Sequence, residues 1–132
     1  MKQLLTLKSP TGQIKEAKHI FSKIKKVDID YSQENTIVFY IATNGTLIGS
    51  EVLFKGGING CLIDPRTLFR KALINNSDRI ILAHNHPNGY LNPSGTDMKT
   101  FKDLSKMGTF LQMPILDFIV FNETNYYSVL EN

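Results

Sequence analysis

The sequence predicts an α/β fold, a single-domain mixed β-sheet flanked by helices. Three observations support this class: apolar residues near the N-terminus recur at helical spacing, two apolar runs flank the dipeptide Asn44-Gly45, and later strand-like runs alternate with helical segments. The chain has 132 residues, of which 42% are hydrophobic. A chain of this length can bury roughly two thirds of its unfolded surface, so it needs no disulfide to support one core.

The first predicted elements are a helix and a β-hairpin. Residues 13–26 place apolar side chains at three- and four-residue steps after a Ser-Pro-Thr-Gly break, which predicts an amphipathic helix. Residues 36–43 and 46–54 flank Asn44-Gly45, the strongest short hairpin signal. One face of the second strand is expected to carry Leu47, Gly49, Glu51 and Leu53. This carboxylate therefore lies among small or apolar neighbours.

The remaining elements follow from caps and apolar runs. Asp64-Pro65 opens a helix that continues to about residue 75, and residues 80–83 form a run of the buried-strand type. Ser94 is expected to cap a third helix, which Gly108 ends. A closing pair of strands is predicted at residues 116–121 and 126–129.

Charge separates the N-terminal region from the remainder. Residues 1–33 hold seven Lys and three acids, a balance of +4, whereas residues 34–132 hold eight Lys or Arg and nine acids, a balance of −1. We expect residues 1–33 to form a basic amphipathic helix packed on a domain of residues 34–132. Five lysines of this helix could meet nucleic acid phosphates, although a lysine-rich face is ordinarily solvated: Lys15, Lys18, Lys23, Lys25 and Lys26. DNA binding is therefore the alternative hypothesis.

Cysteine content and hydropathy favour a cytoplasmic protein without a membrane partner. Cys61 is the only cysteine, so an intrachain disulfide is impossible and a buried thiol is expected. The apolar run at residues 4–7 is too short for a secretory signal, and no run approaches membrane-spanning length.

The most informative motif is His84-Asn85-His86, followed after seven residues by Ser94 and then by Asp97. A chain still extended beyond residues 80–83 points both imidazoles the same way, because side chains alternate along a strand. Asp97 falls in the first turn of the third helix, near the positive end of the helix dipole. Two imidazoles and one carboxylate form the ligand set of a catalytic zinc site that keeps one position for water.

Each part of this motif also has a simpler explanation. His-x-His pairs are common in loops, and Ser94 to Asp97 resembles a capping box, in which an acid at the third helical position returns to the backbone N–H of the cap. The conjunction of both imidazoles and the acid within fourteen residues is not required by a helix cap. It favours metal binding.

This pattern, with a Glu upstream, resembles the JAB/MPN metalloprotease superfamily and its bacterial RadC branch. Four segments carry the likeness: residues 47–56, residues 64–66, residues 81–87, and Leu116-Asp117. The resemblance implies a fold similar to the MPN/JAB (cytidine-deaminase-like) fold and a zinc-dependent hydrolase of peptide or isopeptide bonds, with a peptide or protein substrate. It also implies an association with DNA repair, and in the alternative hypothesis the protein is a DNA-associated binding module whose zinc site is structural or silent.

The resemblance assigns roles to five residues. One zinc ion per chain would be held by His84, His86 and Asp97, Ser94 would hydrogen-bond to the reacting group, and Glu51 would be the acid/base residue.

The chain departs from the branch at three places. Asn88 replaces the usual Ser, Gly56-Gly57 replaces Gly-Thr, and Phe118 replaces a His. None of these changes removes a proposed ligand, but Phe118 excludes any auxiliary role of that histidine.

Overall fold

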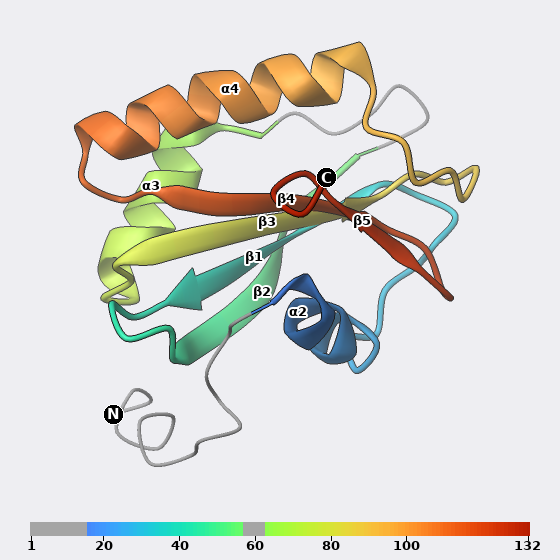
Figure 1. Cartoon of the computed structure of the whole chain (residues 1–132), viewed down its shortest axis with the longest axis horizontal. Helices are drawn as coiled ribbons and strands as arrows, with labels where there is room; N and C mark the ends of the chain where they lie inside the picture. Colours follow the sequence, from blue (N-terminus) through green and yellow to red (C-terminus); the bar gives the residue numbers. More distant parts are fainter. Residues whose placement is uncertain (1–15, 57–62) are drawn as a thin grey trace.

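A five-stranded mixed β-sheet lies between two layers of helices (Figure 1). The computed structural model describes residues 16–56 and 63–132. In chain order the elements are α2 (Ala17–Ile24), β1 (Asn35–Ile41), β2 (Leu47–Lys55), α3 (Pro65–Ile74), β3 (Arg79–Asn85), α4 (Gly95–Phe110), β4 (Ile115–Phe121) and β5 (Tyr126–Ser128). The predicted α/β class is confirmed.

The strand order is β2-β1-β3-β4-β5, in which only β3 and β4 are parallel. Helix α4 forms the crossover that a parallel pair requires. Strand β1 runs antiparallel to β3, and Thr36 near the start of β1 lies opposite His84 near the end of β3. The residues before β1 therefore lie beside the residues after β3.

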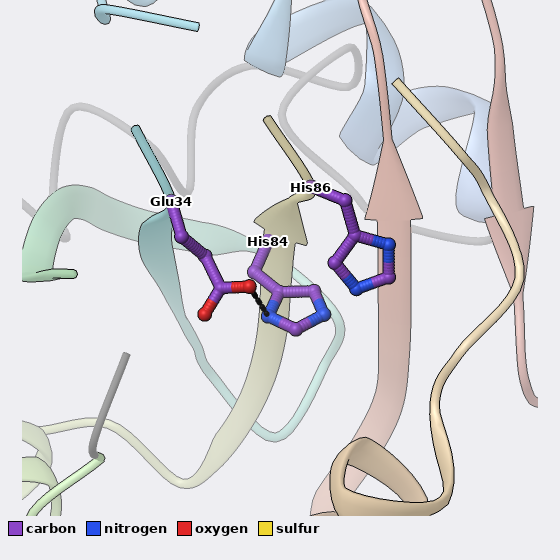
Figure 2. Close-up of side chains that lie close together, drawn as sticks. All are labelled: Glu34, His84 and His86. Atoms are coloured by element: carbon purple, nitrogen blue, oxygen red, sulfur yellow. Dashed lines mark ion pairs between the residues drawn. The ribbon is translucent and has the colours of Figure 1, made fainter. Parts of the chain in front are cut away.

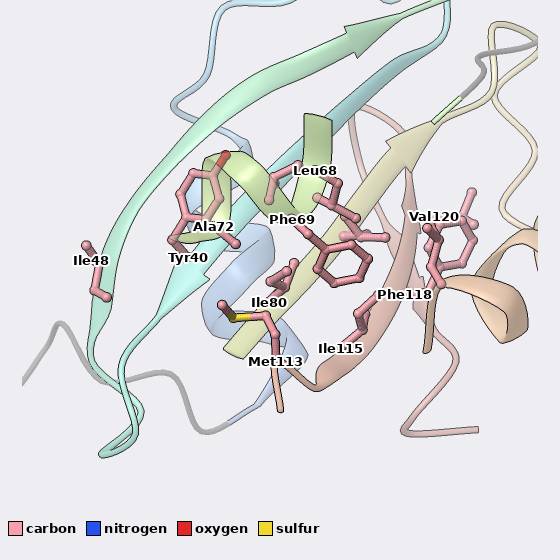
Figure 3. Packing of buried hydrophobic residues seen from close by; sticks show 13 residues of the cluster. Tyr40, Ile48, Leu68, Phe69, Ala72, Ile80, Met113, Ile115, Phe118 and Val120 are labelled. Atoms are coloured by element: carbon pink, nitrogen blue, oxygen red, sulfur yellow. The ribbon is translucent and has the colours of Figure 1, made fainter. Parts of the chain in front are cut away.

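The two faces of the sheet are covered by different helices. One face packs against α3 and α4 and forms the core shown in Figure 3, where Leu68 and Phe69 of α3 lie near Ile80 and Phe118 of the sheet. Leu104 of α4 belongs to the same cluster. On the other face, α2 buries three apolar residues against the sheet: Ala17, Ile20 and Ile24. The helix was expected to pack on a domain of residues 34–132, and the apolar residues of α2 share a core with the strands of that region.

Local sequence signals explain where α3 and α4 begin, but not where α4 ends. Asp64 caps α3 by accepting the Arg66 N–H, and Ser94 caps α4. Gly108 was expected to end α4, yet the helix continues to Phe110. The absence of a side chain at Gly108 serves close packing instead, because a Cβ there would lie 2.4 Å from the backbone oxygen of Met113. The chain leaves the helix through Gln112, at φ 57°.

Two irregularities in the pairing of β1 with β2 change which side chains share a face. They lie between Thr36 and Ile37 and between Tyr40 and Ile41. Consequently Leu47 packs in the α2-side core, not on the face expected for it, and Ile48 joins the opposite core. Glu51 lies opposite Val38, on the face that α3 and α4 cover.

Asp117 anchors the C-terminal segment. It is buried, and its carboxylate accepts hydrogen bonds from the Ser128 hydroxyl at 2.5 Å and from the Leu130 N–H at 2.9 Å. Burial raises the pKa of this carboxyl, although these hydrogen bonds oppose the rise. Its pairing with Ile81 places it on the α2 side of the sheet, opposite the face of the motif histidines.

No helix in residues 16–56 and 63–132 is long and apolar enough to cross a membrane. Cys61, expected to be buried, lies outside the described residues.

Candidate metal centre

Three elements converge at the end of β3. His84 lies within β3 and His86 directly follows it, so strand alternation points both imidazoles to the face covered by α3 and α4. Their ring centroids are 4.8 Å apart. Glu34 directly precedes β1, and Asp97 is the third residue of α4.

Glu34 joins the histidines because of the antiparallel register of β1 and β3. Thr36 lies opposite His84, so Glu34, two residues earlier, shares the face of both imidazoles. Its Oε1 is 3.9 Å from His84 Nδ1 (Figure 2). One ligand atom from each of Glu34, His84 and His86 lies within 4.8 Å of the others, and Glu34 is 7% exposed.

Asp97 reaches the same place from the helix. Its Oδ2 lies 2.9 Å from His86 Nε2 and 3.4 Å from His84 Nε2. Two hydrogen bonds with Ser94 fix the start of α4: the Ser94 Oγ accepts the Asp97 N–H at 2.9 Å, and the Ser94 N–H donates to Asp97 Oδ2 at 2.8 Å. The capping box expected as the simpler explanation is therefore formed, and it also holds the Asp97 carboxylate against both imidazoles.

The loop after His86 fixes the protonation of its ring. His86 Nδ1 is 3.0 Å from the backbone oxygen of Tyr90. A carbonyl only accepts hydrogen bonds, so Nδ1 carries the proton and Nε2 faces the cluster. Two further contacts hold this loop: the Gly89 N–H donates to His86 O at 2.8 Å, and Asn122 Nδ2 donates to Gly89 O at 2.9 Å. A carbonyl behind an imidazole is a common way to orient a metal ligand.

The charges within the cluster are strongly coupled. The hydrogen bond to Asp97 raises the pKa of His86, against the lowering effect of burial. Burial alone would raise the pKa of the Asp97 carboxyl, but contacts with the His84 and His86 imidazoles hold it well below its ordinary value. Without a metal, His86 is therefore stabilised as an imidazolium that donates to both Tyr90 and Asp97.

The environment of His84 suits a bound cation. Its Nε2 is buried and has no hydrogen-bond partner among the described residues, because the 3.4 Å approach to Asp97 lacks hydrogen-bond geometry. An unpaired buried nitrogen is costly, and a metal ion would satisfy it. Two imidazoles, a fixed carboxylate and a nearby second carboxylate suit zinc in particular.

Glu51 is not part of this cluster in the structure. Its Oε2 accepts a hydrogen bond from the Tyr40 hydroxyl at 2.8 Å, and Lys71 Nζ lies 3.6 Å from its Oε1. Burial, followed by the bond to Glu51, raises the pKa of Tyr40. Glu51 shares the sheet face of His84, but strand geometry separates their backbones by roughly 7 Å along the strands and roughly 10 Å across them.

Glu34 was missed by sequence reasoning. The only available signal was its position directly before a strand, β1, that is buried throughout. That signal becomes informative only with the register that places the start of β1 beside the end of β3.

Comparison with known proteins gives the same family as the resemblance of the motif. The profile of the RadC-like JAB domain family matches residues 13–132. The chain is similar to a UPF0758 protein from Chlorobium chlorochromatii, with 35% identity over 77% of this chain and 46% of the relative. A UPF0758 protein from Flavobacterium johnsoniae is 34% identical over 90% of this chain and 52% of the relative. The chain thus spans about half the length of these curated relatives.

Proposed function

Because the chain belongs to the family of RadC-like JAB domains, we propose that it is a zinc-dependent hydrolase of peptide or isopeptide amide bonds. The observation that carries this proposal is the convergence of two imidazoles and two carboxylates: Asp97 Oδ2 lies near the Nε2 atoms of His84 and His86, and Glu34 Oε1 lies on the Nδ1 side of His84. The buried Nε2 of His84 has no hydrogen-bond partner among the described residues. The peptide or protein substrate is part of the proposal, and so is any activity that would belong to a protein of the relatives' full length.

His84, His86 and Asp97 would hold one zinc ion per chain, through the Nε2 atoms and a carboxylate that already face one another. When bound, zinc supplies a Lewis acid and a water that is activated near neutral pH. The Tyr90 carbonyl keeps the His86 proton on Nδ1, so that Nε2 stays available.

Glu34 is the acid/base residue in this proposal. Its carboxylate lies beside the proposed ligands and is buried, which suits a group that takes the proton of the attacking water. The same carboxyl then returns the proton to the leaving nitrogen as the amide C–N bond breaks. Glu51, the residue assigned by the resemblance, is instead engaged by Tyr40 and Lys71.

Ser94 keeps a possible second role. The helix cap uses its Oγ as an acceptor, which leaves the hydroxyl proton free to be donated to another group. A hydroxyl at the edge of the cluster could stabilise the negative oxygen that develops on the attacked carbonyl.

The test combines metal analysis with a cleavage screen over linear and branched isopeptide libraries. Glu34→Gln should retain stoichiometric zinc and lose hydrolysis, whereas Glu51→Gln should retain both. Cleavage by Glu34→Gln, together with an inactive but zinc-loaded Glu51→Gln, would return the acid/base role to Glu51. Absence of zinc-dependent cleavage from the unmodified protein would reject the hydrolase itself.

DNA binding stays a prediction from charge alone. The Lys18 ammonium of α2 pairs with Glu16, the N-cap of the helix, at 3.1 Å, and the ammonium of Lys25, its C-cap, lies 5.0 Å from the centre of the Phe21 ring. Neither contact favours a nucleic acid partner.

A further inference from the structure

Asn85 stands between the two proposed histidine ligands but points to the opposite face of the sheet. It is fully buried and ends β3. Its Nδ2 donates to the backbone oxygen of Gln33 at 2.9 Å, and its Oδ1 accepts the backbone N–H of Asn35 at 2.9 Å. Gln33 and Asn35 are the two neighbours of Glu34 in the chain. One side-chain amide therefore binds the backbone on both sides of Glu34.

Backbone pairing with β3 does not perform this task. The β1–β3 ladder ends at the pair formed by Thr36 and His84, and no ladder pair with β3 includes Glu34. From the β2 side, the Gly56 N–H donates to the Glu34 carbonyl at 2.8 Å. On the β3 side, the Asn85 amide takes the place of the missing ladder bonds.

The Asn35 side chain reinforces the same segment. Its Nδ2 lies within hydrogen-bond distance of three oxygens: Asp30 O at 2.9 Å, Gln33 O at 3.1 Å and Asn85 Oδ1 at 3.2 Å. Its own Oδ1 is buried without a hydrogen-bond partner among the described residues, which makes this network costly. A costly buried network that holds the backbone on both sides of Glu34 suits a role in placing that residue.

We propose that Asn85 is a positioning residue that holds the Glu34 carboxylate beside the metal ligands. The inference rests on the proposed acid/base role of Glu34. Anchoring Gln33 and Asn35 on the α2 side directs the side chain between them to the other face, where both histidines lie. Asn85 thus fixes the position of Glu34, while His84 and His86 on either side of Asn85 would hold the ion.

The experiment compares Asn85→Ala with a matched control, Ser77→Ala, in the zinc-loaded protein. Ser77 is also buried and bridges the same two strands at their other end, since its Oγ lies 3.1 Å from Ile41 N and 2.5 Å from Arg79 O. Asn85→Ala should lower kcat about 100-fold with little change in KM, because a misplacement of about 1 Å costs on this scale. Ser77→Ala should retain the kcat of the unmodified protein even where it loses as much stability as Asn85→Ala.

A double-mutant cycle identifies the group through which Asn85 acts. Because Glu34→Gln should leave no kcat to measure, the cycle uses Glu34→Asp, which keeps a carboxyl group: adding Asn85→Ala to it should lower kcat much less than in the unmodified protein if the two residues act together. Additive losses, or equal kcat for Asn85→Ala and Ser77→Ala, would overturn the proposal. Asn85→Ser keeps a hydroxyl that can bond to one of the two partners and buries no charge, so it should lose less and provides a second variant if Asn85→Ala does not fold.

Three measurements do not depend on turnover. Zinc affinity of Asn85→Ala should stay within a few fold of the unmodified protein, hydrogen exchange at the Asn35 amide should accelerate, and a crystal structure should show the Glu34 carboxylate displaced from His84. Loss of zinc with Glu34 in place would mean that Asn85 supports the ligands, and would refute the inference. If the unmodified protein hydrolyses nothing, the proposed function fails, while the position of Glu34 in this variant still decides the role of Asn85.

Discussion

Substitutions at Ser94 and Asp97 separate the helix cap from the proposed metal site. The two residues exchange two hydrogen bonds at the start of α4, but only Asp97 also contacts both imidazoles. Asp97→Asn keeps an oxygen that can accept the Ser94 N–H, and it removes the negative charge. Ser94→Ala removes the cap acceptor and leaves the carboxylate.

The expected magnitudes follow from these contacts. Zinc at 100 times its dissociation constant stabilises a folded protein by about 2.7 kcal/mol. At about 4 °C per kcal/mol for a domain of this size, the melting temperature should rise by about 11 °C. Loss of a serine cap costs about 1 kcal/mol, so Ser94→Ala should melt about 4 °C lower and still respond fully to zinc. Asp97→Asn should show almost no zinc response.

Thermal denaturation in zinc and in a chelator measures both quantities, with the dissociation constant of the unmodified protein taken from calorimetry. A full zinc response in Asp97→Asn would refute Asp97 as a ligand. Loss of the response in Ser94→Ala would show that the cap and the site cannot be separated, contrary to this reasoning.

Three further predictions concern pH, packing and DNA. Zinc must displace a proton from His86, so the affinity of the protein for zinc, measured by titration, should increase from pH 5.5 to 8. In the metal-free protein, the raised pKa of His86 stabilises the fold below about pH 6.5. This stabilisation is lost as the pH rises through the pKa of His86 in the folded state, which urea unfolding at several pH values can check. Gly108→Ala should destabilise the protein by about 1–3 kcal/mol through its clash with a backbone oxygen, whereas Gly95→Ala, with open space around it, should not. If Lys23, Lys25 and Lys26 bind DNA, the measured affinity should fall steeply with salt and their substitution should flatten that slope; an unchanged slope would exclude them.

The parts of the site that the sequence predicted depend on short-range geometry. His84 and His86 face the same way because the chain is extended through them, and Ser94 and Asp97 form a cap within one helical turn. Each of these relations spans at most three residues. Local rules therefore place each histidine on the strand face and Asp97 at the start of the helix, whereas the contact between His86 and Asp97 depends on the loop between them.

Glu34, the proposed acid/base residue, could not be assigned in this way, because its place beside the histidines depends on strand pairing. Glu34 and His84 are fifty residues apart in sequence, and the antiparallel register of β1 and β3 brings them together. Glu51 carried a local signal, an acid among apolar residues, but the side chains that surround it are Tyr40 and Lys71. A lone carboxylate on an apolar strand face can be satisfied in several ways, and only the tertiary structure distinguishes them.

The cap and the proposed ligand role of Asp97 are compatible. Its Oδ2 accepts the Ser94 N–H and, from the same position, faces the Nε2 atoms of His84 and His86. Since the cap fixes this carboxylate without a metal, a cation would replace the proton between His86 and Asp97 in a site that is already assembled. The capping box that competed with metal binding as an explanation of the sequence thus also holds the carboxylate of the third proposed ligand, through the backbone N–H of Ser94.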